Sequence, residues 1–93
     1  MEIIKICDRE LYSRVHDSVK KLTYSVCKSD DGDRIVYGVQ LKSMLNGEEN
    51  SVLIRDVSSD LEFVLKVIEC LSQNGVDDIC FEDVVRDLVF GSI

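Results

Sequence analysis

The dipeptide Asn46-Gly47 constrains the fold of this chain more than any other feature of its sequence. Both central residues of a type I′ turn need a positive φ angle, and Asn-Gly adopts that turn readily. Segments rich in β-branched and other apolar residues flank the dipeptide on both sides, which is typical of a β-hairpin. The turn therefore predicts that residues 34–45 and 50–57 form two antiparallel strands.

A second turn signal, Asp30-Asp31-Gly32-Asp33, predicts a further strand at residues 19–28. Apolar and polar residues alternate along these strands, as in an antiparallel sheet with one buried face. Tyr24 and Tyr37 fall on the inward face, where they are placed to pair across neighbouring strands. The full inward set is Leu22, Tyr24, Val26, Ile35, Tyr37, Val39, Leu41, Val52 and Ile54. The outward set is Lys21, Thr23, Ser25, Cys27, Arg34, Val36, Gly38, Gln40 and Lys42.

The N-terminal segment predicts a fourth strand at residues 2–7, with Ile4 and Ile6 facing inward. Residues 8–18 fit two structures. They can form a short helix that begins after Asp8 as its cap, or they can extend the strand into another hairpin.

After residue 58 the apolar period changes from that of a strand to that of a helix. Ser59 and Glu62 have the spacing of a capping box, with Ser59 as the N-cap, and predict a helix over 60–73 that ends at Gly75. A second helix is expected over 81–90. Strands followed by helices predict an α+β fold: a three- or four-stranded antiparallel meander sheet with two C-terminal helices packed on one face.

Three short motifs in these elements resemble those of a family of small, uncharacterised clostridial proteins of about this length, and the likeness covers nearly the whole chain. The motifs are Leu22-Thr23-Tyr24-Ser25-Val26, Tyr37-Gly38-Val39 and Phe81-Glu82-Asp83-Val84-Val85-Arg86-Asp87. The chain departs from the family pattern before its last helix, where Asp77 and Asp78 stand nearby and no Pro is present. The resemblance implies no activity, cofactor or site, since the family's function is unknown.

The composition indicates a small acidic domain. The 93 residues are 45% hydrophobic, which predicts one folded domain over 1–93. No basic leader and no apolar run of about 20 residues are present, so a soluble, cytoplasmic protein is expected. The net charge of −7 is uneven, with +1 on residues 1–46 and −8 on residues 47–93. Because phosphate repels an acidic chain, direct binding of nucleic acid is not expected.

Catalytic and metal-binding patterns are weak. His16 is the single histidine, and its near neighbours do not form the distant-segment geometry of a catalytic triad. The aspartates of residues 30–33 lack the spacing of a calcium-binding loop. No two of the four cysteines form a Cys-x-x-Cys motif, and Cys27, beside Lys28, is the one mild candidate for a reactive thiol. A non-enzyme without cofactor or metal is therefore expected.

An acidic cluster near the C-terminus is the main candidate for a functional surface. It consists of Asp77, Asp78, Glu82, Asp83 and Asp87. A solvated helix face explains such a cluster, because acids near a helix N-terminus favour the macrodipole. The functional hypothesis is a non-catalytic regulator or inhibitor that docks this face on a protein with a basic surface, including one that handles nucleic acid.

Two further expectations concern the sheet. Lys21, Arg34 and Lys42 on its outward face predict a dipolar molecule, and an uncovered strand edge would allow a homodimer. The alternative function is a small-ligand-binding domain or minimal enzyme, with a pocket between sheet and helices near Arg55. No membrane partner is expected.

Overall fold

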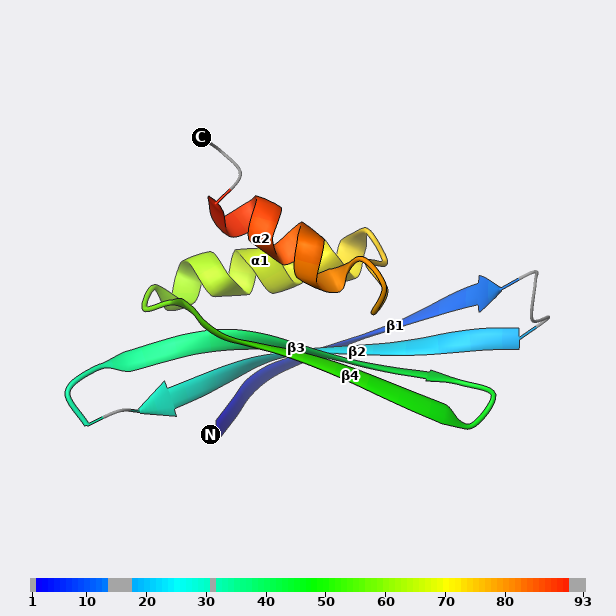
Figure 1. The fold of residues 1–93 in the computed structure, drawn as a ribbon, viewed down its shortest axis with the longest axis horizontal. Coiled ribbons are helices and arrows are strands. Elements are labelled where there is room, and N and C mark those ends of the chain that lie inside the picture. Colours follow the sequence, from blue (N-terminus) through cyan, green and yellow to red (C-terminus); the bar gives the residue numbers. More distant parts are fainter. Residues whose placement is uncertain (1, 14–17, 31, 91–93) are drawn as a thin grey trace.

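The computed structural model describes residues 2–13, 18–30 and 32–90, and it shows a four-stranded antiparallel sheet with two helices on one face (Figure 1). The elements are β1 (Glu2–Ser13), β2 (Ser18–Asp30), β3 (Ile35–Leu45), β4 (Glu48–Ser58), α1 (Leu61–Gln73) and α2 (Phe81–Phe90). Each strand lies beside the one that follows it in the sequence. The predicted α+β meander with two C-terminal helices is confirmed.

The Asn-Gly turn joins β3 to β4 as predicted. Asn46 has φ 53° and Gly47 has φ 82°, and Leu45 pairs with Glu48 directly across the turn. At the other hairpin, the backbone N–H of Gly32 donates to Asp30 Oδ1 at 2.9 Å. These local bonds fix the two turns and thereby the register of the three strands that they connect.

β1 is longer than the sequence predicted. It runs to Ser13, which pairs with Ser18 of β2, so residues 8–13 extend the strand and the helical alternative is wrong for them. The remaining residues of that segment, 14–17, lie outside the described residues, as does His16 among them. Residues 8–13 therefore continue the antiparallel pairing of β1 with β2 and do not form a helix.

The faces of β1 were predicted wrongly. Ile6 pairs with Ser25 on the face without helices and is 57% exposed, and Ile4 lies in a bulge. Cys7 and Leu11 pack against the core instead. Because apolar residues occur on both faces of this strand, alternation alone did not decide which face is buried.

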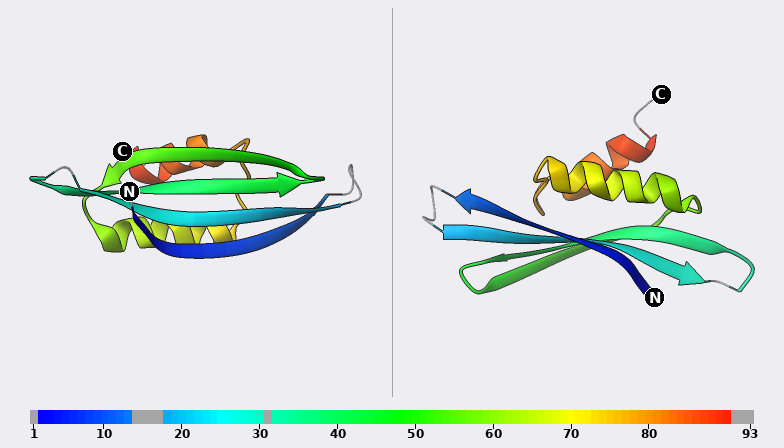
Figure 2. Two further views of the ribbon diagram at one scale, coloured as in Figure 1. Left: turned by 90° about the horizontal axis from the view of Figure 1, so that it is seen from below. Right: turned by 180° about the vertical axis from the view of Figure 1, so that it is seen from behind.

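The core lies between the sheet and the helices. α1 lies over one face of the sheet and contacts all four strands, whereas α2 packs mainly against α1 and β4 (Figure 2). The buried core residues are Leu22, Tyr24, Val26, Val39, Leu41, Val64, Val67, Ile68, Leu71, Phe81 and Val85. Burial of each large apolar side chain contributes about 1.5–3 kcal/mol, so these residues supply most of the driving force for docking the helices.

Both tyrosines predicted to face inward do so, but they do not pair with each other. Tyr24 is fully buried and lies opposite Leu41, whereas the half-buried Tyr37 lies opposite Lys28. Val52 and Ile54 of β4 also pack against the core as predicted. The inward face is therefore apolar along its centre, and the two tyrosines lie on it without being cross-strand partners.

The start of α1 differs from the prediction by one residue. Asp60, not Ser59, is the N-cap, and its side chain accepts the N–H of Phe63 at 3.3 Å. The Oγ of Ser58 accepts the N–H of Asp60 at 3.0 Å. Several neighbouring residues are able to cap, and the hydrogen bonds at Asp60 decide between them.

The end of α1 is a Schellman motif at the predicted glycine. Gly75 has φ 60°, and its N–H donates to the Ser72 carbonyl at 3.2 Å. The N–H of Val76 donates to the Leu71 carbonyl at 3.1 Å. This arrangement satisfies the last carbonyl groups of α1 and turns the chain sharply towards α2. None of the described helices is long and apolar enough to cross a membrane.

Candidate protein-binding surface

The connection between α1 and α2 carries the first two residues of the acidic cluster. Oδ1 of Asp77 accepts the backbone N–H groups of Ile79 at 3.1 Å and Cys80 at 3.4 Å. The carbonyl of Cys80 in turn accepts the N–H of Val84, which begins the bonding of α2. Asp77 therefore has a local role, since it holds the turn from which α2 starts.

Asp78 is bound to the sheet. Its Oδ1 accepts a hydrogen bond from Lys20 Nζ of β2 at 2.6 Å, and the same ammonium lies 3.9 Å from Oδ2 of Asp77. The side chains of Lys20 and Asp78 are only 17% and 18% exposed. The hydrogen bond from Lys20 holds the pKa of the Asp78 carboxyl below its usual value, with partial burial acting in the opposite direction.

A second contact holds the same connection. The hydroxyl of Tyr24 donates to the carbonyl oxygen of Val76, on the chain segment just before the two aspartates. Burial raises the pKa of Tyr24 to about 12; the positive charge of Arg9 lowers that pKa and the negative charge of Asp77 raises it, each by a smaller amount. Two residues of β2, Lys20 and Tyr24, therefore fasten the α1–α2 connection to the sheet.

α2 carries the other three acidic residues. Oε1 of Glu82 accepts from Arg86 at 2.6 Å, one turn further along the helix, and both side chains are more than half exposed. Asp83 and Asp87 are exposed and form no ion pair with any other described residue. Since they are four residues apart, they lie on one side of α2 and repel each other.

The acidic cluster therefore divides into two parts. Asp77 and Asp78 are occupied by bonds within the molecule, whereas Glu82, Asp83 and Asp87 are exposed to solvent. The sequence analysis did not identify Lys20, the cation that binds Asp78, approaches Asp77 and so sets these two acids apart from those of α2. A signal was available, because Lys20 has the same parity as Leu22 and Tyr24 and so falls on the helix-facing side of β2.

α1 adds further negative charge to the helical layer. Asp60, Glu62 and Glu69 are exposed, with Lys66 as the one basic residue of this helix. Oε1 of Glu69 accepts from Gln73 within the helix, and Asp60 caps its start. The layer opposite the sheet is therefore acidic on both helices, with Arg86 and Lys66 as its cations.

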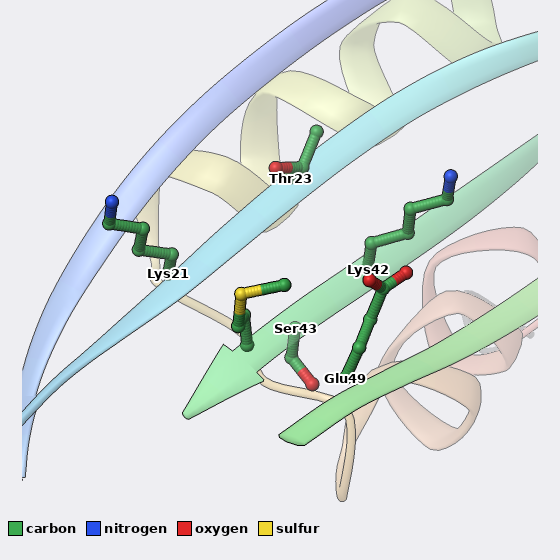
Figure 3. A pocket seen from close by; sticks show the side chains of 6 residues that line it. Lys21, Thr23, Lys42, Ser43 and Glu49 are labelled. Atoms are coloured by element: carbon green, nitrogen blue, oxygen red, sulfur yellow. The ribbon is translucent and has the colours of Figure 1, made fainter. Parts of the chain in front are cut away.

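The other face of the sheet is not the basic surface that was predicted. Lys21 lies opposite Glu10, Thr23 donates to Asp8 at 3.1 Å, and Arg34 precedes β3 rather than lying on it. A recess of about 260 Å³ on this face is lined by Lys21, Thr23, Lys42, Ser43, Met44 and Glu49 (Figure 3). Acidic side chains lie beside the lysines on this face, so the predicted basic sheet face is wrong. The molecule instead has an acidic helical layer over a sheet whose uncovered face carries both signs of charge.

A recess next to Arg55 corresponds to the pocket expected for the alternative function. It lies where the end of β4 meets α2, and its volume is about 110 Å³. Its lining residues are Ile54, Arg55, Asp56, Val57, Val85, Arg86, Val89 and Phe90. Pockets for small organic ligands are usually about 300–1,000 Å³, so this recess admits only a very small group.

Cys27 does not have the surroundings of a reactive thiol. It points to the face without helices, as predicted, but it is buried, and burial raises the pKa of its thiol. Cys80 is the exposed cysteine among the four. No group of three His, Cys, Asp or Glu side chains within the described part of the chain is placed to hold a metal ion.

Comparison with known proteins assigns the chain to a family. Residues 4–90 match the Family of unknown function DUF6514. The chain belongs to the DUF6514 family. The DUF6514 match covers β1 from Ile4 onward and the whole of the other strands and helices, and it agrees with the expected resemblance to a family of unknown function. No curated protein matches the chain. No solved structure matches it either.

Proposed function

We propose that this protein is a non-catalytic, cytoplasmic protein-binding module, a regulator or inhibitor that docks its acidic helical layer on a basic surface of another protein. The contact residues are Glu82, Asp83 and Asp87 of α2. Asp77 and Asp78 act with them by holding the start of α2 in place. The partner class includes proteins that handle nucleic acid, whose basic surfaces suit an acidic ligand.

One observation carries this proposal: two exposed carboxylates on α2, those of Asp83 and Asp87, have no cationic partner among the described residues, while the helix start is held to the sheet. Asp83 and Asp87 form no ion pair within the described residues, so their charge is available to a partner. Lys20 and Tyr24 bind the connection that leads into α2. Since the helix is held in place before binding, less conformational entropy is lost when a partner docks.

The test is a pull-down of the tagged full-length chain from soluble lysate of the source cells, at low and high salt, read by mass spectrometry. We expect one defined basic protein, captured at low salt and weakened at high salt because exposed charges are screened. The triple variant Glu82→Lys, Asp83→Lys and Asp87→Lys is expected to lose that protein.

A matched control changes the same amount of charge elsewhere. Glu2, Asp33 and Glu48 are exposed acids outside the helical layer, and their replacement by Lys alters the net charge equally. Binding that is lost in the α2 variant and kept in this control supports the assignment. Equal binding by both variants, each with a native circular dichroism spectrum, contradicts it.

The alternative function is binding of a small ligand near Arg55. The recess between β4 and α2 favours it, because Arg55 and Arg86 both line that space and suit a small anion. A thermal-shift screen with small carboxylates and phosphate tests this alternative. Stabilisation that disappears in Arg55→Ala, with no protein partner captured, would favour the alternative over the acidic surface.

The clostridial source suggested by the sequence motifs is also a proposal. It rests on the three motifs quoted above. A genome survey that finds this family mainly outside clostridia would contradict it.

A further inference from the structure

The sheet has two edges, and each is a row of backbone groups paired on one side only. β1 forms one edge and β4 the other (Figure 2). Such edges bind further strands when their side chains permit it. We propose that β4 binds β4 of a second copy of this chain in antiparallel register, with Val52 on the two-fold axis, so that the two sheets become one.

Charge selects this register. With Val52 opposite its own copy, Glu49 of each chain lies opposite Arg55 of the other, and the symmetry makes this pair twice. Glu49 and Arg55 are six residues apart in β4, an even number, so they share a face of the joined sheet. Opposite charges directly across an antiparallel pair stabilise it.

Neighbouring registers lack these pairs. With Ser51 on the axis, Glu49 lies opposite Leu53. With Leu53 on the axis, Arg55 lies opposite Ser51. A register centred between two residues would place inward residues of one copy directly opposite outward residues of the other. Directly opposite residues of an antiparallel pair point to the same face, so this register is excluded.

The paired stretch has a defined end. Glu48 and Asp56 would meet next in this register, and their like charges would repel. However, Asp56 has φ 57° and lies in the irregular part of β4, where the ladder to β3 skips from Ile54 to Ser58. The backbone therefore leaves the extended form directly after Arg55, and pairing stops before the two acids meet.

The other edge does not offer such a register. With Cys7 of β1 on the axis, Lys5 lies opposite Arg9. With Asp8 or Arg9 on the axis, that charge lies opposite its own copy. A bulge between Ile3 and Lys5 also interrupts the strand. β1 thus carries the features by which natural edge strands avoid pairing, whereas β4 does not over residues 49–55.

Apolar surface accompanies the β4 edge. Val52, Leu53 and Ile54 are each only partly buried although they are central to the strand. Phe90 of α2, which is 67% exposed, lies beside the end of β4 next to Arg55. A second copy at this edge would cover these side chains. The contact does not use the acidic residues of α2, so it is independent of the proposed function.

The test is the mass of the full-length chain in solution, measured by sedimentation with a thiol reductant over a range of concentrations. We expect twice the chain mass of 10.5 kDa at high concentration. Glu49→Arg should weaken the dimer roughly tenfold, because two favourable pairs become two repulsive ones. The double variant Glu49→Arg, Arg55→Glu should restore it, since the pairs return with their signs exchanged.

Glu48→Arg is the matched control. Residue 48 lies just outside the paired stretch 49–55, so the same change of charge there should leave the dimer unchanged. A chain that stays monomeric at every concentration overturns the proposal. A dimer that Glu49→Arg does not weaken also overturns it, and loss of that dimer in Ile6→Asp or Met44→Glu would place the contact on the uncovered sheet face instead.

A cross-link tests the axis directly. In a Cys80→Ser background, Val52→Cys places two thiols opposite each other across the two-fold axis, where Cβ atoms are about 4.5–5.5 Å apart. Mild oxidation should link the chains through residue 52. Asn50→Cys lies opposite Ile54 in this register and should link far less. Equal cross-linking of both variants contradicts the register.

Discussion

Lys20 and Asp78 are 58 residues apart in the sequence, yet their side chains meet at 2.6 Å between β2 and the α1–α2 connection. The pair lies on the helix-facing side of the sheet and is mostly shielded from water. Because the ammonium also approaches Asp77, one lysine binds both acids of the connection. The negative charge that precedes α2 is therefore part of the fold, while the negative charge on α2 is exposed.

Asp78→Asn should destabilise the protein by about 1–3 kcal/mol, because it removes a charge-assisted hydrogen bond and leaves Lys20 partly buried without its main partner. Urea unfolding followed by circular dichroism measures the change. Glu82→Gln is the control, since it breaks an exposed pair at the same distance of 2.6 Å and should cost less than about 0.5 kcal/mol. Equal costs for the two variants would show that the Lys20 contact adds nothing to stability.

The same pair predicts a dependence of stability on acid. The pKa of Asp78 is lower in the folded protein than its ordinary value of 3.8. Its contribution is therefore fully present above that ordinary value and is lost as the pH falls through the lower folded pKa. Urea unfolding between pH 6 and pH 2 should show wild type losing its advantage over Asp78→Asn below about pH 4. A constant difference between them down to pH 2 would contradict this assignment.

Local signals in the sequence predicted most of the fold. Asn46-Gly47 and Gly75 have the positive φ angles that their turns require, so their roles could be predicted from residue type alone. The faces of β1 could not, because Ile6 and Cys7 are neighbouring apolar residues on opposite faces. The choice between them depends on which face the helices cover, and that is a tertiary contact.

The candidate surface was predicted only in part. The acidic residues are visible in the sequence, but their division into bound and exposed groups depends on Lys20, which approaches from a distant strand. Similarly, the basic outward face was inferred from Lys21, Arg34 and Lys42 alone, without the acidic residues that share that face of the sheet. Glu10 and Asp8 reach that face only through the long β1–β2 hairpin, which the sequence left undecided.

Tyr24→Phe should destabilise the protein by about 1–2 kcal/mol, because the partly buried carbonyl of Val76 loses its donor while the ring stays in place. The raised pKa gives a second measurement. Since the folded pKa of about 12 exceeds the ordinary tyrosine value of 10.0, the neutral phenol contributes stability below pH 10 that is lost as the pH rises towards 12.

An ultraviolet titration of the phenolate tests this assignment. The component that titrates near pH 12 should be absent in Tyr24→Phe. Tyr37→Phe serves as the control, since that ring is only half-buried, and it should leave the component unchanged. A component near pH 12 that persists in Tyr24→Phe would assign it to another tyrosine.

Gly38→Ala should destabilise the protein by about 1–3 kcal/mol, the usual cost of forcing extra atoms into a packed site. A Cβ atom at residue 38 would lie 2.5 Å from the carbonyl oxygen of Ile54 and 3.1 Å from the Cα of Arg55. Both are backbone atoms of β4, so relief requires that the edge strand itself moves. Gly32→Asn is the control, because no atom lies within 4 Å of a Cβ there and Asn tolerates its φ of 86°. Urea unfolding compares the two, and a Gly38→Ala variant as stable as wild type would show that β4 is not held against β3 at this point.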